Sequence, residues 1–513
     1  MQVEKQDAVS AFLAEPGTYG DVSTVEVLHT HVSSVFLAGD RALKLKRAVR
    51  LPYADFSTAE IRLAACEKEY ALNAAISPEL YLGVRRITRA AEGGLAFDGP
   101  GALADAVVEM RRFDPDSRLD LMARRGALTR AIVLALADRI AAAQETAEVA
   151  RGAEGAANIA GVLDINRAGF AESDVFAEDE VASLDAAFRA ALDAHAPLLD
   201  ARARAGQVRR CHGDLHLRNV CLHDGRPTLF DCLDFNDALA TVDVLYDLAF
   251  MAMDLWHGGL PGFANLLVNR YLDVTEQEDG VPLIPFFTAL RAAVRAHVTA
   301  TQSLSAAPEE RADLRAAARA YRDLAEEILA PRTPRLVALG GFSGSGKSTV
   351  AEALAPGLGA PPGARVLESD RLRKALHGVR PETSLPDTAY APEVSETVYR
   401  RLAERAQALV AGGASVVACA VFDRPERRAA MADAARAAQV PFTGLWLDAD
   451  PELLRRRVTD RAPNASDADA QVLATQLRRD PGAMDWTRVS TARPLDATLD
   501  DARARILPDT PPS

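Results

Sequence analysis

Short apolar segments separated by turns fill the first hundred residues of the chain, a pattern typical of β-strands. Val35–Leu37 and Ala42–Lys46 flank the dipeptide Gly39-Asp40, which predicts two strands joined by a tight turn. Apolar side chains at helical spacing then predict an amphipathic helix over Thr58–Ile76. Three further apolar segments are predicted to be strands: 81–84, 94–97 and 106–110. The chain is therefore predicted to begin with a small β-rich lobe that holds one helix.

From about residue 128 the chain becomes rich in alanine, the strongest helix former, and helices are predicted. The predicted helical segments are 128–149, 181–205, 244–253, 285–304 and 308–329. Pro331 and Pro334 follow the last of them and end it, because the residue before a proline is disfavoured in a helix. We therefore predict a boundary between two domains at these prolines.

Beyond this boundary, short apolar segments alternate with helical stretches. The predicted strands are 335–339, 364–367, 414–418 and 441–447. Apolar strands separated by helices are typical of a parallel sheet covered by helices on both faces. The predicted fold class is thus an α+β N-terminal domain followed by an α/β domain with a parallel sheet.

The composition is ordinary for a soluble globular protein, with 49% apolar and 26% charged residues among 513. The formal net charge of −13 argues against nucleic-acid and anionic-membrane binding, because either would need a basic surface. The five cysteines show no CxxC spacing, which favours a reducing compartment over a disulfide framework or a zinc site. No stretch approaches the roughly 18 uninterrupted apolar residues of a membrane span. We therefore expect a cytoplasmic protein that binds small molecules and neither membranes nor nucleic acids.

The segment His212-Gly213-Asp214-Leu215-His216-Leu217-Arg218-Asn219 has the layout of a phosphoryl-transfer catalytic loop. Such transfer needs charge neutralised on the phosphates and a nucleophile held in line. Asp214 is predicted to accept or orient the proton of a substrate hydroxyl, and Asn219 to offer its amide oxygen to Mg²⁺. A second metal ligand is expected directly after the next strand, where Asp231 lies. Asp234 is the competing or additional ligand.

These residues, with Tyr246-Asp247-Leu248-Ala249 beyond them, resemble the aminoglycoside phosphotransferase family of the protein-kinase-like superfamily. The resemblance implies a bilobal kinase-like domain over residues 1–330 that uses ATP. Its small lobe is expected at about 20–110 and its large lobe at about 111–330. It also implies that Asp247 braces the catalytic loop.

The same resemblance predicts a lysine on the third strand paired with a glutamate on the following helix. Lys44 is our choice for the lysine, with Lys46 on the same strand face as the alternative, and Glu69 is the predicted partner. The backbone of Glu109 and Met110 is predicted to form the hinge that binds the adenine. The family name does not define the substrate. Arg291 and Arg295 on a predicted helix form either a solvated face or part of a site for an anionic acceptor.

A second phosphate-binding signature, Gly341-Phe342-Ser343-Gly344-Ser345-Gly346-Lys347-Ser348, satisfies the P-loop pattern G-x-x-x-x-G-K-[ST]. An apolar strand precedes it and a helix begins beyond it, which is the context that the motif requires. The glycines let backbone N–H groups turn toward the phosphates, and Lys347 reaches the terminal ones. Ser348 is predicted to bind Mg²⁺ through its hydroxyl. The predicted ATP-binding residues are Gly341, Ser343, Gly344, Ser345, Gly346, Lys347, Ser348 and Thr349.

The region 335–507 resembles small P-loop kinases of metabolites and the related zeta-toxin-like group. The element Ser369-Asp370-Arg371-Leu372-Arg373 carries this likeness, which implies that Asp370 contacts the acceptor hydroxyl or a magnesium-bound water and that Arg373 binds substrate. Further along, Arg457 and Arg461 resemble arginines of the lid. They are expected to stabilise charge on the transferred phosphoryl group, although such a helix can also be a solvated face.

One position departs from these relatives, since Cys419 stands where an acidic residue is expected at the end of a strand. Either Asp423 or Asp370 replaces that acid, or the domain binds ATP without efficient transfer. Two hypotheses follow. The chain is a phosphotransferase with two nucleotide sites acting on small-molecule hydroxyl groups, or a single active kinase domain is regulated by an ATP-binding partner domain.

Overall fold

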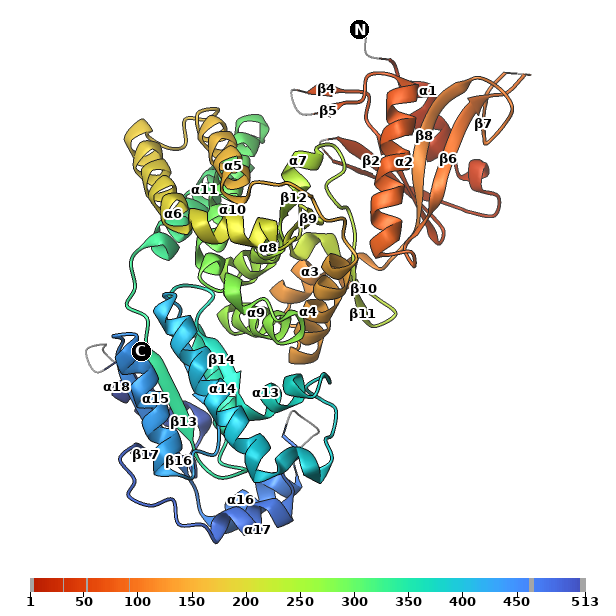
Figure 1. Cartoon of the computed structure of the whole chain (residues 1–513). Coiled ribbons are helices and arrows are strands. Elements are labelled where there is room, and N and C mark those ends of the chain that lie inside the picture. Colours follow the sequence, from red (N-terminus) through yellow and green to blue (C-terminus); the bar gives the residue numbers. More distant parts are fainter. Residues whose placement is uncertain (1–3, 31, 52–53, 92, 461–465, 508–513) are drawn as a thin grey trace. The chain divides into compact units, whose positions relative to one another are not determined.

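Figure 1 shows the computed structural model of the chain, which describes residues 4–30, 32–51, 54–91, 93–460 and 466–507. The chain forms two compact units, one made of Met1–Asn158 and Leu199–Met251, the other of Ile159–Leu198 and Ala252–Ser513. These units divide the chain at other points than the predicted domains do. No helix among the described residues has the length and apolar character needed to cross a membrane.

The first unit contains a six-stranded antiparallel sheet in the order β1-β2-β3-β8-β6-β7. Its strands are β1 (Val25–His29), β2 (Ser33–Ala38), β3 (Arg41–Lys46), β6 (Tyr81–Arg89), β7 (Leu95–Phe97) and β8 (Leu103–Arg111). Gly39, with φ +58°, forms the predicted turn between β2 and β3. Helix α2 (Ala59–Ile76) begins after Thr58, whose side chain accepts a hydrogen bond from the Ile61 N–H. The predicted strands and helix of the small lobe are confirmed.

Strand β3 separates apolar from charged side chains because successive residues of a strand point to opposite faces. Leu43 and Leu45 are buried in a core with Phe36 and Val107. Lys44 and Lys46 therefore lie on the other face, which α2 covers. The alternation of leucine and lysine thus directs two lysines toward one helix.

The first unit also contains strands and helices outside the six-stranded sheet. They are α1 (Asp7–Ala14), β4 (Arg50–Leu51), β5 (Ala54–Asp55), α3 (Leu119–Arg124), α4 (Arg130–Glu145), β9 (Val208–Arg210), β10 (Val220–His223), β11 (Arg226–Leu229), α7 (Asp237–Ala240) and β12 (Thr241–Asp243). Strand β10 pairs with β11, and β9 pairs with β12. Three helices have residues in both units: α5 (Gly155–Phe170), α6 (Glu178–Arg204) and α8 (Val244–His257).

The second unit contains a five-stranded parallel sheet in the order β14-β15-β13-β16-β17. Its strands are β13 (Leu336–Gly340), β14 (Arg365–Glu368), β15 (Val416–Cys419), β16 (Phe442–Asp448) and β17 (Thr487–Ser490). The predicted parallel sheet is confirmed. The sequence did not predict β17, because this edge strand buries one of its four residues and lacks an apolar segment.

Helices cover both faces of this sheet (Figure 1). On one face, Val337 and Leu339 of β13 contact Val350 of α12 and Leu499 of α18 in a shared core. Helices α14 and α15 cover the other face. The helices of the second unit are α9 (Pro261–Thr275), α10 (Leu283–Ser305), α11 (Pro308–Leu329), α12 (Lys347–Leu354), α13 (Ser369–Leu376), α14 (Pro392–Ala411), α15 (Pro425–Ala437), α16 (Pro451–Thr459), α17 (Ala470–Leu477) and α18 (Leu495–Ile506). The glycine loop leaves the carboxyl end of β13, which is where parallel α/β sheets bind ligands.

Candidate active sites

Five side chains of alternating charge form a chain of ion pairs in the first unit, which we call the ion-pair chain: Asp231, Lys44, Glu69, Lys46 and Asp234. Lys44 Nζ lies 2.8 Å from Glu69 Oε1 and also pairs with Asp231. Lys46 Nζ lies 2.6 Å from Glu69 Oε2 and also pairs with Asp234. Both candidate lysines therefore bind the same glutamate, one at each carboxylate oxygen.

Burial disfavours the charged forms along the ion-pair chain, and at Lys44 and Glu69 the ion pairs outweigh burial. Lys44 is desolvated, but Asp231 and Glu69 raise its pKa well above the ordinary value. Burial likewise disfavours the Glu69 carboxylate, yet Lys44 and Lys46 hold its pKa below the ordinary value. At Asp234 burial prevails and raises the pKa despite Lys46. The Asp231 side chain is 47% exposed and the Asp234 side chain is 10% exposed. Asp231 is therefore the end of the ion-pair chain that is open to solvent.

The catalytic loop brings Asp214 and Asn219 into contact. Asn219 Nδ2 donates to Asp214 Oδ2 at 2.9 Å and to the Asp214 carbonyl oxygen at 3.0 Å. His216 Nε2 lies 3.4 Å from the other carboxylate oxygen of Asp214, whose side chain is 41% exposed. The Asp214 carboxylate is therefore oriented by two neighbours while it remains open to a substrate.

Two buried side chains support this loop from within the first unit. His212 Nδ1 accepts from the Asp214 N–H at 3.3 Å, and His212 Nε2 lies 3.0 Å from the Phe230 carbonyl oxygen. These partners require a neutral ring with its proton on Nε2, and burial lowers the pKa of His212 in agreement. Asp247 Oδ1 accepts from the Gly213 N–H at 2.9 Å. Asp247 thus contacts the loop backbone, as the family resemblance implied.

The oxygen atoms at this site suit a magnesium ion. Asn219 uses its amide nitrogen to hold Asp214, which leaves its carbonyl oxygen as a ligand. Asp231 has φ +61°, and its N–H donates to the Tyr81 hydroxyl at 3.0 Å. This left-handed backbone is uncommon for a residue other than glycine. Amide and carboxylate oxygens are ligands that Mg²⁺ prefers, so Asn219 and Asp231 fit the ion.

Glu109 and Met110 lie inside β8, between the paired strands β3 and β6. The Glu109 carboxylate accepts from Arg41 at 2.7 Å. In a central strand the neighbouring strands take up backbone hydrogen bonds that an adenine would need. Their role as the hinge stays a prediction.

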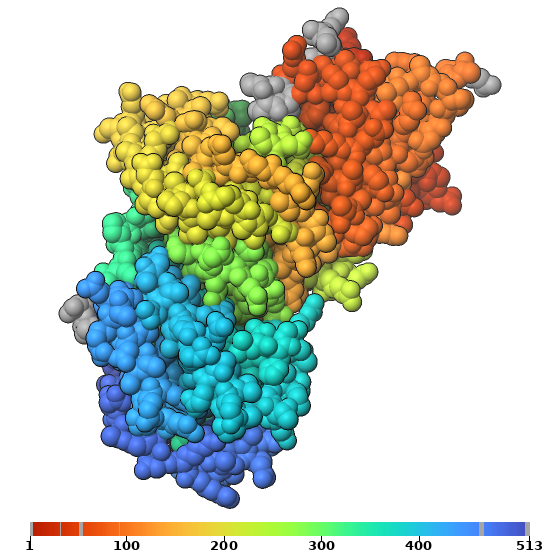
Figure 2. All heavy atoms as spheres, viewed as in Figure 1, coloured from red at the N-terminus to blue at the C-terminus, as the bar shows by residue number. Residues whose placement is uncertain are grey.

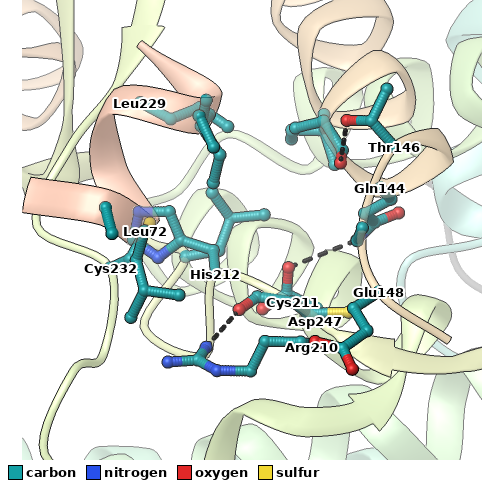
Figure 3. A pocket seen from close by; sticks show the side chains of 17 residues that line it. Leu72, Gln144, Thr146, Glu148, Arg210, Cys211, His212, Leu229, Cys232 and Asp247 are labelled. Carbon is teal, nitrogen blue, oxygen red and sulfur yellow. Dashed lines mark hydrogen bonds between the residues drawn. The ribbon is translucent and has the colours of Figure 1, made fainter. Parts of the chain in front are cut away.

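A cavity of about 180 Å³ is lined by α2, α4 and part of the catalytic loop (Figure 3). Its walls include His212 and Asp247, and Gln144 Nε2 donates to Asp247 Oδ2 at 3.2 Å. Neither Asp214 nor Asn219 is among its lining residues. The hydrogen bonds at this cavity therefore support the catalytic loop, and the exposed side of Asp214 lies elsewhere.

In the second unit the glycine loop has the conformation that its sequence predicts. Gly341, Gly344 and Gly346 have φ values of +141°, +83° and +87°, which favour glycine. A Cβ atom at Gly344 would lie 2.6 Å from the Leu454 carbonyl oxygen, so the approach of α16 also requires glycine. Lys347 Nζ donates to the carbonyl oxygens of Gly341 and Phe342 at 2.8 and 3.1 Å. The Lys347 ammonium group thus lies against the glycine loop, where it is predicted to bind phosphates.

A cavity of about 470 Å³ opens over this loop. The predicted residues from Ser343 to Thr349 line it, together with Asp370 and Arg457. Burial raises the pKa of Asp370, against the opposing effects of Ser466 and Lys347. The cavity is therefore bordered by the glycine loop and by a carboxyl group whose pKa is raised by burial.

The predicted arginines lie in different places. Arg373 is buried, donates to the Ala389 carbonyl oxygen at 2.6 Å, and stacks 4.7 Å above the Tyr390 ring. Arg457 donates to the carbonyl oxygen of Thr491 at 2.8 Å and to that of Gly344 at 3.5 Å. Arg461 lies outside the described residues. The substrate-binding and charge-stabilising roles of these arginines stay predictions.

Cys419 ends β15 and is 3% exposed, and burial raises its pKa well above that of an ordinary thiol. Of its two candidate replacements, Asp423 is engaged at both oxygens, by Arg427 at 2.9 Å and by Arg479 at 2.6 Å. Asp370 instead lines the cavity. The geometry therefore favours Asp370 over Asp423 as the acid of this site.

Gln476 of α17 is a contact that sequence reasoning missed. Its Oε1 accepts a hydrogen bond from the Ser343 N–H at 2.8 Å, so one backbone N–H of the glycine loop is bound by a side chain. Tyr81 at Asp231 was missed as well. No motif marks either residue, because each acts through a single contact that only the fold creates.

The arginines of α10 do not share one environment. Arg291 is buried, whereas the Arg295 guanidinium lies 5.6 Å above the Tyr321 ring of α11. Neither side chain is therefore part of a simple solvated face. The anionic acceptor that they were taken to suggest stays a hypothesis.

Two regions of the chain match models of known families, one on each side of the proline boundary. Residues 88–281 match the family described as "Phosphotransferase enzyme family" and residues 336–480 match "AAA domain". The resemblance drawn from the motifs, an aminoglycoside phosphotransferase-like domain joined to a P-loop domain, is confirmed. The chain thus carries two kinase-like regions, which makes phosphoryl transfer the class of activity that they support.

Relatives are similar over nearly the whole chain. An uncharacterised protein of Mycobacterium tuberculosis is 29% identical over 494 residues, 94% of this chain and 95% of its own. A Mycobacterium bovis protein matches to the same extent. Among solved structures, a gluconokinase from Sinorhizobium meliloti 1021 is 26% identical and covers 34% of this chain and 93% of its own, with a TM-score of 0.25. A thermostable mutant of an aminoglycoside phosphotransferase is 14% identical and covers 60% and 96%, with a TM-score of 0.37.

Proposed function

We propose that this chain is an ATP-dependent phosphotransferase with two nucleotide sites, each of which transfers the γ-phosphoryl group to a hydroxyl group of a small molecule. The ion-pair chain beside the catalytic loop carries the proposal. The ion-pair chain supplies a cation for the phosphates and a carboxylate for Mg²⁺. The catalytic loop beside it supplies the amide oxygen of Asn219 and the open carboxylate of Asp214. This set meets the needs of phosphoryl transfer, which are positioning and charge neutralisation.

In the first site Lys44 would bind the phosphates of ATP while Glu69 fixes its ammonium group. Asp214 would orient the acceptor hydroxyl and take its proton, since its carboxylate is exposed and held by Asn219. Asn219 and Asp231 would hold Mg²⁺, with Asp234 engaged by Lys46. The ion, when bound, would neutralise phosphate charge.

In the second site the loop amides from Ser343 to Thr349 and Lys347 would bind the phosphates, and Ser348 would hold Mg²⁺. Asp370 would receive the acceptor hydroxyl at the cavity wall. Arg373, Arg457 and Arg461 keep their predicted roles in substrate binding and charge stabilisation. This site lacks a carboxylate at Cys419, and Asp370 would serve in its place.

Cys419 also supports a second candidate function. With a buried thiol in place of the strand-end acid, the P-loop region would bind ATP and regulate the phosphotransferase-like region instead of transferring phosphate. Binding residues persist under this alternative, while transfer is weakened. The two candidate functions differ in whether the P-loop site forms phosphorylated products of its own, which would require Lys347.

The test compares the wild-type chain, Asp214→Ala, Lys347→Ala and the double variant. Each is incubated with radiolabelled ATP and a fractionated metabolite extract, and labelled products and free phosphate are measured. We expect each single variant to lose one set of products and the double variant to lose all. Asp224→Ala is the control, because this acid is exposed in the β10–β11 turn.

Two other outcomes decide against the proposal. If Asp214→Ala and Lys347→Ala both leave hydrolysis and transfer unchanged, neither site is a phosphotransferase site. If Lys347→Ala alters only the rate at which Asp214-dependent products form, the regulatory alternative is correct.

A further inference from the structure

Helix α9 contacts the edge strand β14 within the second unit, through side chains that are buried beneath the surface drawn in Figure 2. Asn269 Oδ1 accepts from the Val366 N–H at 2.8 Å, and its Nδ2 donates to the Ala364 carbonyl oxygen at 3.2 Å. Asn265 Nδ2 donates to the same carbonyl oxygen at 3.0 Å. An edge strand leaves one row of backbone groups unpaired. Here two asparagine side chains bind that row, so α9 is joined to the sheet by specific contacts.

Asp273, one turn further along α9, joins two arginines of the P-loop region. Its Oδ1 lies 2.6 Å from Arg365 of β14, and its Oδ2 lies 2.6 Å from Arg371 of α13. The Asp273 side chain is 6% exposed. Burial opposes its charge, but Arg365 and Arg371 outweigh burial and hold the pKa of Asp273 below the ordinary value. Removing one partner of such a buried charged pair leaves the other charge buried without compensation, which makes Asp273 a strong anchor.

Arg371 connects Asp273 to the wall of the P-loop cavity. Its Nε lies 2.6 Å from Glu368 at the end of β14, so the guanidinium group joins Asp273 to the start of α13. Asp370, which lines the cavity, directly precedes Arg371 in the first turn of α13. The position of Asp370 therefore depends on an arginine that α9 holds.

We propose that Asp273 is a positioning residue for the P-loop site: through Arg371 it holds the first turn of α13, and with it Asp370, at the cavity wall. Helix α9 lies within residues 88–281, the region that matches the phosphotransferase family. The phosphotransferase-like region thus supplies part of the second site, and a displacement of α9 changes the place of Asp370. The effect on turnover rests on the proposed function, whereas the anchoring of α13 does not.

Hydrogen exchange of the full-length chain tests the anchoring directly. We compare wild type, Asp273→Asn, Arg371→Gln and Glu382→Gln. Amides of Ser369–Leu376 are expected to exchange about tenfold faster in the first two variants, because a charged hydrogen bond is lost. Glu382→Gln is the matched control. The Glu382 carboxylate also pairs with α9, 2.8 Å from Arg270, but it is exposed and lies outside α13. Arg371→Gln keeps the Asp273–Arg365 pair, so it tests the link even if Asp273→Asn unfolds.

Turnover is then measured in chains that also carry Asp214→Ala, so that the P-loop site alone is observed. We expect kcat to fall by about tenfold to a hundredfold in Asp273→Asn and Arg371→Gln, with KM for ATP within about twofold, because misplacement impairs transfer more than binding. The proposal is overturned if α13 exchanges as in wild type, or if exchange rises equally throughout the second unit. If exchange responds as expected while the Asp214→Ala parent shows no turnover, anchoring is supported and phosphoryl transfer at the P-loop is contradicted.

Discussion

The two proposed nucleotide sites of this chain are built in opposite ways. The first joins residues far apart in sequence, such as Lys44 and Asp231, which are separated by 187 positions. The second is built around consecutive residues from Gly341 to Ser348. The first site pairs its lysine with two carboxylates, whereas Lys347 contacts backbone carbonyl oxygens of its own loop. A site assembled by the tertiary fold thus balances its charges internally, while a local loop offers its backbone to the ligand.

The first test concerns the closed end of the ion-pair chain and has the largest expected effect. Lys46→Met leaves Asp234 and one oxygen of Glu69 buried without a cation. We expect the free energy of unfolding to fall by about 3–5 kcal/mol, as when one partner of a buried pair is removed. Urea unfolding of the full-length chain measures it.

Lys46→Met/Asp234→Leu is the matched control, since it replaces one buried ion pair by apolar side chains. It should recover most of the lost stability. A Lys46→Met chain as stable as wild type would mean that the ion-pair chain does not organise the first site.

The second test concerns Lys44, which lies next to the solvent-exposed end of the ion-pair chain. Lys44→Met removes the cation that is proposed to bind the phosphates, and we expect kcat of the first site to fall about 10²–10³-fold, as for loss of one electrostatic donor. Rates are measured in a Lys347→Ala chain, so that the first site alone is observed. Arg41→Met is the control, because Arg41 lies on the same strand in an exposed pair with Glu109. Equal losses in both variants would contradict a phosphate-binding role for Lys44.

The sequence predicted the P-loop site better than its surroundings. Consecutive residues between an apolar strand and a helix specify the loop, and the strand, the loop and the helix are all present. Helix α9 was not predicted, although it holds the edge strand through Asn265 and Asn269. Side-chain contacts between segments almost a hundred residues apart leave no local pattern.

In the first site the family resemblance predicted the Lys44–Glu69 contact, and the structure contains it. The sequence offered Lys44 and Lys46 as alternatives, and the fold uses both. Periodicity places two lysines on one face but cannot reveal that a single glutamate has an oxygen for each. The positive φ of Asp231 is likewise set by tertiary contacts.

The P-loop site differs from the first in lacking a carboxylate at the end of β15, where Cys419 stands, and Cys419→Asp tests that difference. The new carboxylate would lie near Glu368, which opposes its charge, and near Lys347 and Arg371, which favour it, since all three influence the Cys419 thiol. Outer-shell ligands change metal affinity by about 10–100-fold, so we expect Mg²⁺ to support ATP binding at roughly tenfold lower concentration. Calorimetry with and without Mg²⁺ measures it, with Cys419→Ser as the control. An unchanged Mg²⁺ requirement would mean that Asp370 already supplies the acid.

The smallest expected effect is a difference in pH dependence between the two sites. Lys44 and Lys46 hold the pKa of Glu69 below its ordinary value despite burial. A lowered carboxylate pKa contributes stability above the unfolded-state value and loses it as the pH falls through the folded-state value. The pairs of Glu69 with Lys44 and Lys46 should therefore persist at a pH where an ordinary glutamate is already protonated.

Asp370 has the opposite shift, because burial raises its pKa. As the pH falls, Asp370 becomes protonated before an ordinary aspartate does, and a protonated carboxyl cannot accept the acceptor's proton. Turnover of the P-loop site in an Asp214→Ala chain should therefore decline at a higher pH than an unshifted aspartate allows. Initial rates across the acidic range measure this, and Asp370→Asn should remove the decline along with most of the activity. If turnover instead declines at the pKa of an ordinary aspartate, the proton acceptor is another residue. Among the described carboxylates that line the cavity, Asp370 is the one whose pKa is raised by burial.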